Sequence, residues 1–221
     1  MKKIINWFPE DDPYTKKGEI KLHTDLHKIK YKNKDFTSRK DRIKHIKNAE
    51  KIIGNNIEGN VLDIGCGNGR DSLFFESEGL KVISIDNSKS IEFLGNPNNF
   101  YKVDIVDIDF KVDIYYARFL IHAIEEEVFD SFLKNLHKLM FEGSKFVFET
   151  RSTKNITNLE KQPTNFKSSI GEKHFRMLYS EKYLKSKLEE NFKIDYLKEL
   201  DNVSKYKTDN PCVIRGIISK K

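Results

Sequence analysis

The chain alternates between short apolar runs and longer stretches in which apolar positions recur at every third or fourth residue. Short runs closed by a polar residue predict buried strands, and the second pattern predicts amphipathic helices. The expected strands are 61–64, 81–85, 100–103, 113–117, 145–149, 192–199 and 212–219, and the expected helices are 39–53, 70–77, 89–94, 125–140 and 180–190. Strands that alternate with helices predict an α/β fold, with a mainly parallel sheet covered by helices on both faces.

Two segments do not fit this alternation. Residues 1–36 have few apolar positions and a turn at 11–13, and they predict an N-terminal arm that is partly helical. Residues 151–175 are polar and aperiodic, and a connection this long is typical of an active-site loop or lid. We therefore expect an arm over 1–36 and a single domain over 37–221, with the loop 151–175 inserted in it.

The composition limits the class of protein. With 221 residues, of which 38% are hydrophobic, the chain is long enough for one domain with its own core. No run of about 18 apolar residues could span a membrane, and residues 1–21 are too polar for a secretion signal. The cysteines, Cys66 and Cys212, are far apart and lack metal-ligand spacing. These features favour a cytoplasmic protein without disulfides or a bound metal.

The net charge of +6 is unevenly distributed along the chain. Residues 60–150 contain 9 Lys and Arg against 16 Asp and Glu, whereas the segments before and after them are basic. Basic flanks can attract an anionic partner, such as a phosphorylated substrate or a nucleic acid. The alternative is that the basic residues only cover solvent-exposed faces of the protein. This alternative is supported because 33 of the 40 basic residues are Lys, whereas phosphate-binding sites favour Arg.

A glycine-rich turn follows the first expected strand, in the segment Asp63-Ile-Gly-Cys-Gly-Asn-Gly-Arg70. Glycines at the carboxyl end of a parallel strand allow positive φ angles and let a ligand approach the backbone without meeting a Cβ atom. Asp86 lies 23 residues after Asp63, at the tip of the next strand. A carboxylate there can accept hydrogen bonds from both hydroxyls of an adenosine ribose. The turn and the acid together predict a nucleoside cofactor.

A nicotinamide dinucleotide is one alternative for this cofactor. The dinucleotide fingerprint places a third glycine or alanine three positions after the second glycine. In this chain Arg70 occupies that position, and the third glycine, Gly69, comes one place earlier. A side chain as large as Arg would obstruct the close approach of the helix that a pyrophosphate requires. The spacing therefore disfavours a dinucleotide.

The pattern Asp-x-Gly-x-Gly-x-Gly resembles the first motif of class I S-adenosylmethionine-dependent methyltransferases, and the resemblance covers residues 60–150 and the closing strands. It implies a Rossmann-like seven-stranded sheet whose last strand is antiparallel, with S-adenosyl-L-methionine as cofactor and S-adenosyl-L-homocysteine as product. It also implies that the cofactor lies against the glycine turn and the tips of the next strands. The residues at the matching positions are Asp63, Gly65, Cys66, Gly67, Gly69, Arg70, Asp86, Asn87, Asp104, Ile105 and Ala117.

The same resemblance places the methyl acceptor beside the fourth strand, in the segment from Ala117 to His122. Methyl transfer mainly requires the acceptor to be held about 3 Å from the methyl group and in line with the leaving sulfur. A general base is needed only when the acceptor carries a proton. His122 is the candidate base because histidine titrates near neutrality, and a structural histidine is the alternative. We assign His122 and Arg118 as candidate catalytic residues.

A second set of residues could bind an anionic acceptor. The planar guanidinium of Arg donates two parallel hydrogen bonds to a phosphate or a carboxylate. The alternative for the two arginines of this set is that they form surface ion pairs, which contribute little to stability. The candidate substrate-binding residues are Arg151, His174, Arg176 and Tyr179.

The acceptor is constrained mainly by what the sequence lacks. Methyltransferases that modify exocyclic amino groups of bases resemble one another in an Asn/Asp-Pro-Pro-aromatic run after the fourth strand. Here that run is Ala117-Arg-Phe-Leu120. The chain also lacks a basic stripe interleaved with aromatic residues. A nucleic-acid substrate is therefore disfavoured.

The segment around His122 is similar to bacterial methyltransferases of small metabolites, including some associated with capsule or lipopolysaccharide sugars. We expect transfer to an oxygen, and less favourably to a nitrogen, of a small phosphorylated or nucleotide-linked acceptor. The enzyme is expected to be a monomer or a homodimer that does not bind membranes. The alternatives are an RNA-directed methyltransferase and a non-catalytic partner subunit that binds the cofactor.

Overall fold

The computed structural model describes residues 4–7, 20–23, 60–67, 69–77, 79–87, 100–155, 165–167, 173–204 and 210–221. The strands are β1 (Ile4–Trp7), β2 (Ile20–His23), β3 (Asn60–Ile64), β4 (Lys81–Asp86), β5 (Phe100–Lys102), β6 (Ile114–Arg118), β7 (Lys145–Arg151), β8 (Asn165–Lys167), β9 (Lys173–Phe175), β10 (Phe192–Leu200) and β11 (Val213–Lys220). The helices are α2 (Arg70–Ser77), α3 (Glu126–Leu139) and α4 (Glu181–Glu189).

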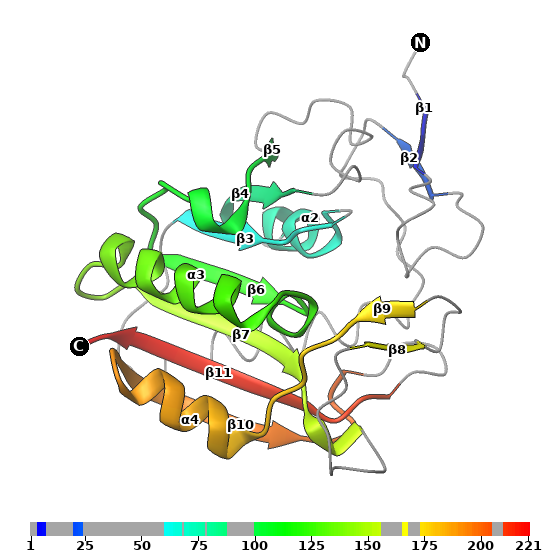
Figure 1. Cartoon of the computed structure of the whole chain (residues 1–221). Coiled ribbons are helices and arrows are strands. Elements are labelled where there is room, and N and C mark those ends of the chain that lie inside the picture. The colour runs from blue at the N-terminus through cyan, green and yellow to red at the C-terminus, as the bar shows by residue number, and fades with distance from the viewer. Residues whose placement is uncertain are drawn as a thin grey trace.

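The central sheet has seven strands in the order β10-β11-β7-β6-β3-β4-β5 (Figure 1). The chain runs from β3 outward to β5, then returns to the other side of β3 with β6 and β7. The pairs from β5 to β7 are parallel, and β11 is antiparallel to both β7 and β10. The expected Rossmann-like sheet with an antiparallel last strand is thus confirmed. Its switch point lies between β3 and β6, where sheets of this kind bind ligands at their carboxyl edge.

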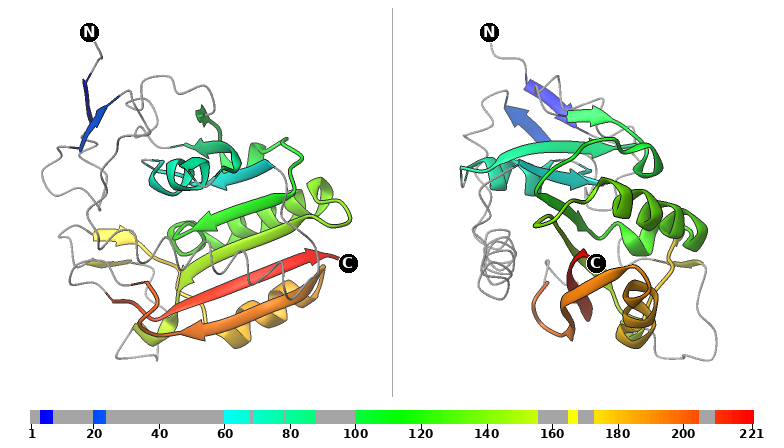
Figure 2. Two further views of the ribbon diagram at one scale, coloured as in Figure 1. Left: turned by 180° about the vertical axis from the view of Figure 1, so that it is seen from behind. Right: turned by 90° about the vertical axis from the view of Figure 1, so that its left-hand side faces the viewer.

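Helices cover both faces of this sheet (Figures 1 and 2). The larger core cluster joins apolar side chains of α3 and α4 to β3, β4, β6, β7 and β11. The smaller cluster joins Phe75 of α2 to Val61, Tyr116 and Val147 on the opposite face. Successive residues of β6 and β7 therefore contribute to opposite cores, which explains why these strands are apolar without alternation.

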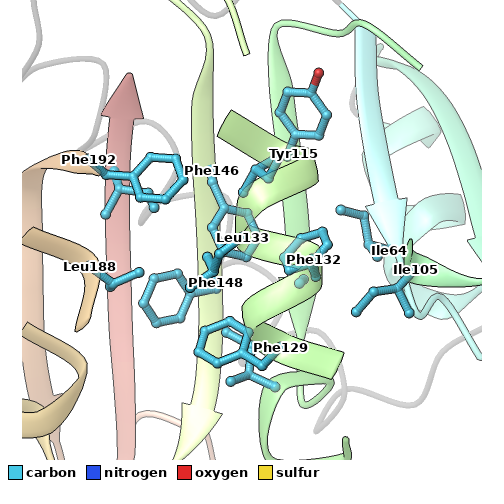
Figure 3. Packing of buried hydrophobic residues seen from close by; sticks show 14 of the residues in the cluster. Ile64, Ile105, Tyr115, Phe129, Phe132, Leu133, Phe146, Phe148, Leu188 and Phe192 are labelled. Carbon is cyan, nitrogen blue, oxygen red and sulfur yellow. The ribbon is translucent and has the colours of Figure 1, made fainter. Parts of the chain in front are cut away.

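Aromatic rings form much of the larger core (Figure 3). Phe132 of α3 meets Phe146 edge-on at 5.5 Å between ring centroids, and Phe146 stacks on Phe148 at 5.2 Å. All three side chains are at most 1% exposed. Gly216 of β11 pairs in register with Phe148 and leaves room for its ring, because a Cβ atom there would lie 2.2 Å from Phe148 Cζ.

Each described strand and helix of the sheet domain lies within two residues of its predicted bounds. The largest difference is in β7, which extends to Arg151 because Arg151 still pairs with Val213. Within the expected arm, the described segments β1 and β2 pair as antiparallel strands, and the rest of the arm, which was expected to be partly helical, lies outside the described residues. The loop 151–175 contains the antiparallel pair β8 and β9.

Some expectations lie outside the described residues. They are the helices 39–53 and 89–94, most of the arm, and most of the loop. Figures 1 and 2 place the β8–β9 pair beyond the carboxyl ends of β6 and β7. In the part of the chain that is described, no helix is long and apolar enough to cross a membrane.

We predict that Gly216→Ala lowers the free energy of unfolding by about 1–3 kcal/mol, because the added methyl group overpacks the core against the Phe148 ring. Urea unfolding followed by circular dichroism measures this change. In a Phe148→Leu background the same substitution should cost clearly less, since the ring that it meets is gone. Equal costs in both backgrounds would contradict this explanation.

Candidate active site

The glycine turn joins the carboxyl end of β3 to α2 and is held against β4. Gly65, Gly67 and Gly69 all have positive φ angles, of 70°, 53° and 67°. The backbone N–H groups of Gly65 and Cys66 both donate to the Ile85 carbonyl, at 2.8 and 3.0 Å. The backbone of the turn is therefore fixed before any ligand binds.

Asp86, the last residue of β4, lies against this turn. Its Oδ2 accepts a hydrogen bond of 2.7 Å from the backbone N–H of Gly67. A Cβ atom at Gly67 would meet nothing within 4 Å, whereas one at Gly65 would lie 2.9 Å from Leu120 and one at Gly69 2.5 Å from Phe100. Of the three glycines, Gly67 is therefore the one at which a side chain would enter open space.

Asp63 supports the turn from within the sheet. It is 3% exposed, and its Oδ2 accepts a hydrogen bond of 2.5 Å from the hydroxyl of Ser72 on α2. This bond ties β3 to α2 across the turn. Burial, followed by the nearby Asp63 and Asp86 carboxylates, raises the pKa of the Cys66 thiol well above its ordinary value. A thiol whose pKa is raised in this way is poorly suited to act as a thiolate nucleophile.

The residues after β4 and β5 also meet. Asn87 Nδ2 donates to Asp104 Oδ2 at 2.7 Å, and Asp104 Oδ1 caps a short 3-10 helix, Ile105–Asp107, by accepting from the Val106 N–H. Ile105 is 9% exposed and belongs to the larger core cluster. Ala117 of β6 is fully buried and pairs with Ile64 beside the turn. The predicted cofactor residues thus gather at one edge of the sheet.

Arg118, at the carboxyl end of β6, bridges two carboxylates. Its Nη1 lies 3.2 Å from Asp71 Oδ2 on α2, and its Nε lies 3.3 Å from Glu149 Oε1 on β7. Glu149 is 2% exposed and also accepts from Arg215 Nε at 2.7 Å and from the Ser204 hydroxyl at 2.8 Å. Arg118 therefore connects the first turn of the helix after the glycine turn to a buried charged group in the sheet.

Phe119 follows Arg118 in a strained conformation. Its φ of 56° lies in the left-handed region, which costs a non-glycine residue about 1–3 kcal/mol. Its N–H donates to the Glu149 carbonyl at 2.8 Å. The guanidinium carbons of Arg118 and Arg151 lie 4.6 and 5.6 Å from its ring centroid. Strain of this kind, held by neighbours on two strands, is typical of functional sites.

His122 lies next to Phe119, in a short 3-10 helix over Ile121–Ala123. The two rings meet edge-on at 5.6 Å, and His122 is 1% exposed. Its Nδ1 accepts from the Arg151 N–H at 3.3 Å and lies 3.2 Å from the Thr150 hydroxyl. Burial, and then the charges of Arg176 and Arg151, lower the pKa of His122 well below its ordinary value.

The structure therefore brings Arg118, Arg151 and His122 together around Phe119, and the charge of Arg176 acts on the His122 ring. Tyr179 is the exception in the predicted substrate-binding set. Its ring is 2% exposed and lies 5.8 Å from Phe129 and 5.7 Å from Tyr183, in the core between α3 and α4. The assignment of Tyr179 as a substrate contact stays a prediction. The side chains of Arg70 and His174 lie outside the described residues.

The sequence-based prediction missed Glu149 and the left-handed conformation of Phe119. A signal for Glu149 was present, because it interrupts the apolar run of β7 just as Arg215 interrupts the apolar run of β11. Single charges of opposite sign within two buried strands indicate a buried pair. The left-handed conformation of Phe119 has no such signal, since it depends on contacts with Glu149 and the arginines.

The glycine turn fits the predicted cofactor. Open space at Gly67, a carboxylate beside it and two further polar groups, Asn87 and Asp104, match what a nucleoside with a charged amino-acid tail requires. When bound, S-adenosylmethionine supplies an electrophilic methyl group on a sulfonium. Among the described residues, no three His, Cys, Asp or Glu side chains are grouped as metal ligands.

Solved structures share this architecture. One is an S-adenosylmethionine-dependent methyltransferase from Methanosarcina mazei, 20% identical, with a TM-score of 0.63 over 80% of this chain and 96% of that chain. The glycopeptide N-methyltransferase MtfA, complexed with S-adenosyl-L-methionine, is 12% identical, with a TM-score of 0.61 over 84% and 94%. TehB from Haemophilus influenzae is 23% identical, with a TM-score of 0.60 over 80% of this chain and 62% of that chain.

At these identities, the likeness to the solved structures establishes the fold. A separate comparison with curated proteins found no match. The fold, the glycine turn and the acid after β4 define a class I S-adenosylmethionine-dependent methyltransferase, with S-adenosylmethionine as its cofactor. The model of the family described as tellurite resistance protein TehB matches residues 26–208. The chain belongs to that family.

We predict that Gly67→Ala weakens binding of S-adenosylhomocysteine by about tenfold or more, because its methyl group would enter the open space at the turn, where we expect the cofactor to lie. Gly79→Ala is the matched control, since Gly79 also has a positive φ and open space around it but lies after α2, away from the turn. Each variant should lose about 1 kcal/mol of stability. Calorimetry and thermal unfolding measure the two effects, and equal loss of affinity in both variants would contradict the prediction.

The buried His122 predicts a pH dependence of stability. Its pKa is lowered in the folded state, so below the ordinary value of 6.5 the unfolded chain binds more protons than the folded chain. The free energy of unfolding should therefore fall as the pH drops below 6.5, by up to about 1.4 kcal/mol per unit from this group. Denaturant unfolding between pH 7.5 and 5 should show a shallower slope in His122→Gln. Identical slopes would refute the effect.

Proposed function

We propose that this methyltransferase acts on an oxygen of a small anionic acceptor, of the phosphorylated or nucleotide-linked kind. The observation that carries the proposal is the contact of Arg151 and His122 with Phe119, at the carboxyl edge next to the glycine turn, where the charge of Arg176 also acts on the His122 ring. Guanidinium groups at such an edge attract and orient an anion. The family's description names tellurite, which is a small oxyanion, and this supports the same class of acceptor.

In this proposal the two halves of the site have separate tasks. The glycine turn, Asp86 and the Asn87–Asp104 pair hold the cofactor, and Arg151 and Arg176 bind the acceptor. Arg118 has two of its nitrogens engaged by Asp71 and Glu149. We therefore propose that it orients the acceptor side indirectly, by fixing Phe119 between the two halves. Catalysis then rests on proximity and orientation, for which a rigid edge of the sheet is suited.

A capsule or cell-surface sugar is one source of such an acceptor, and transfer to nitrogen is the less favoured outcome. We also propose that the arm and the loop 151–175 close over the acceptor as a lid. An RNA substrate would use the basic flanks instead, and its binding would have to persist at physiological salt. A partner subunit without catalysis would bind the cofactor and turn over no acceptor.

The test begins with calorimetric titration of cofactor-free protein with S-adenosylmethionine, S-adenosylhomocysteine and NAD. We expect micromolar binding of the first two, a loss of about 100-fold in Asp86→Ala through the ribose hydrogen bonds, and no binding of NAD. Preference for NAD would overturn the cofactor assignment.

Turnover is then measured with radiolabelled S-adenosylmethionine on sugar phosphates, nucleotide sugars, sodium tellurite and RNA. Arg176→Gln should lower kcat/KM for an anionic acceptor about 10- to 100-fold by removing a charged donor, with cofactor affinity unchanged. Lys198→Gln, on the outer strand β10, is the control for loss of one positive charge. Transfer confined to uncharged acceptors or to RNA would overturn the proposal.

A further inference from the structure

The two ring nitrogens of His122 have different environments. Nδ1 accepts a hydrogen bond from the backbone N–H of Arg151. A backbone N–H can only donate, so this nitrogen must present its lone pair, and the proton of the neutral ring is on Nε2. The backbone of His122 is also anchored, because the Met177 N–H donates to the His122 carbonyl at 2.9 Å.

The Nε2–H group is buried and has no hydrogen-bond partner among the described residues. A buried donor without an acceptor costs about 1–3 kcal/mol, and native structures keep such a group where a ligand or water completes it. Phe119 meets the ring edge-on at 5.6 Å, and the positive charges of Arg176 and Arg151 act on the ring. These charges favour an acceptor that carries negative charge as the partner of Nε2.

The same surroundings oppose a role for His122 as a general base. A base would have to take a proton on Nδ1, which already faces a backbone N–H, or on Nε2, which already carries hydrogen. Charging the ring would also place a third cation beside Arg151 and Arg176, within the interior of the protein. The ring can donate a hydrogen bond at no such cost.

We propose that His122 donates a hydrogen bond from Nε2 to the methyl acceptor, and that the acceptor atom enters the site already ionised. This inference rests on the proposed function and narrows it to oxyanions and thiolates, in place of sugar hydroxyls. An ionised acceptor uses its own lone pair to form the bond to the methyl carbon. The electrons of the broken carbon–sulfur bond stay on sulfur, so the step balances without transfer of a proton.

The first experiment does not depend on turnover. Protein labelled with ¹⁵N-histidine and saturated with S-adenosylhomocysteine is studied by NMR at pH 7.5, with His122→Gln used to assign the signal. We expect a neutral ring protonated on Nε2, whose signal shifts on titration with sodium phosphate or sodium tellurite. An Nδ1-protonated or charged ring, or no shift with either anion up to high millimolar concentrations, would overturn the inference.

The second experiment compares two variants at the same position. The side-chain amide of His122→Gln keeps an N–H donor close to the place of Nε2, and His122→Leu has none. Loss of a hydrogen bond to a charged group lowers affinity by about 10- to 100-fold. We therefore expect anion affinity and kcat/KM to fall by that factor in His122→Leu and by less than about threefold in His122→Gln. A general base would leave both variants equally inactive.

The two proposals fail in different ways. If the NMR signals and the anion affinities behave as expected but no anionic acceptor is methylated, the proposed function is wrong and the donor role of His122 stands. If an anionic acceptor is methylated but His122→Gln, shown to be folded by thermal unfolding, is as impaired as His122→Leu, the donor role is wrong and the proposed function stands.

Discussion

The arrangement of this site depends on one buried carboxylate. Glu149 is 2% exposed and accepts hydrogen bonds from Arg118, Arg215 and Ser204. It thereby joins the ends of β6 and β7 to β11 and to the segment before β11. A buried carboxylate is stable only when it is paired in this way, and loss of one partner typically costs 3–5 kcal/mol. The carboxyl edge of the sheet is therefore held by charge as well as by backbone pairing.

Glu149 and its partner Arg118 also hold the strained residue beside them. Phe119 keeps its left-handed conformation because its N–H is bound by the Glu149 carbonyl and its ring lies under the Arg118 guanidinium. Arg118 reaches Asp71 in the first turn of α2 as well. The cofactor turn and the acceptor side are thus parts of one continuous network. Such a network can keep the acceptor in line with the cofactor, which is the main requirement of methyl transfer.

The sequence predicted the elements of the sheet domain within two residues because their signals are local. Apolar periodicity, the glycines of the turn and the Ser180 cap of α4 act over a few positions. That the predicted cofactor residues lie at one edge was predictable for the same reason, since parallel strands bring their carboxyl ends together there. The packing of Tyr179 was not predictable, because its position next to the loop gave no indication that α3 and α4 bury its ring.

The sequence by itself determined the class of fold, the place of the glycine turn and the acid that lies against it, all of which follow from short patterns and the geometry of parallel strands. Only the tertiary structure decided the rest. Glu149 and Arg215 are 66 residues apart, and the Arg151 N–H that donates a hydrogen bond to His122 comes from 29 residues away. Which nitrogen of His122 carries the proton depends on that distant contact, because a ring nitrogen takes its role from the group that packs against it.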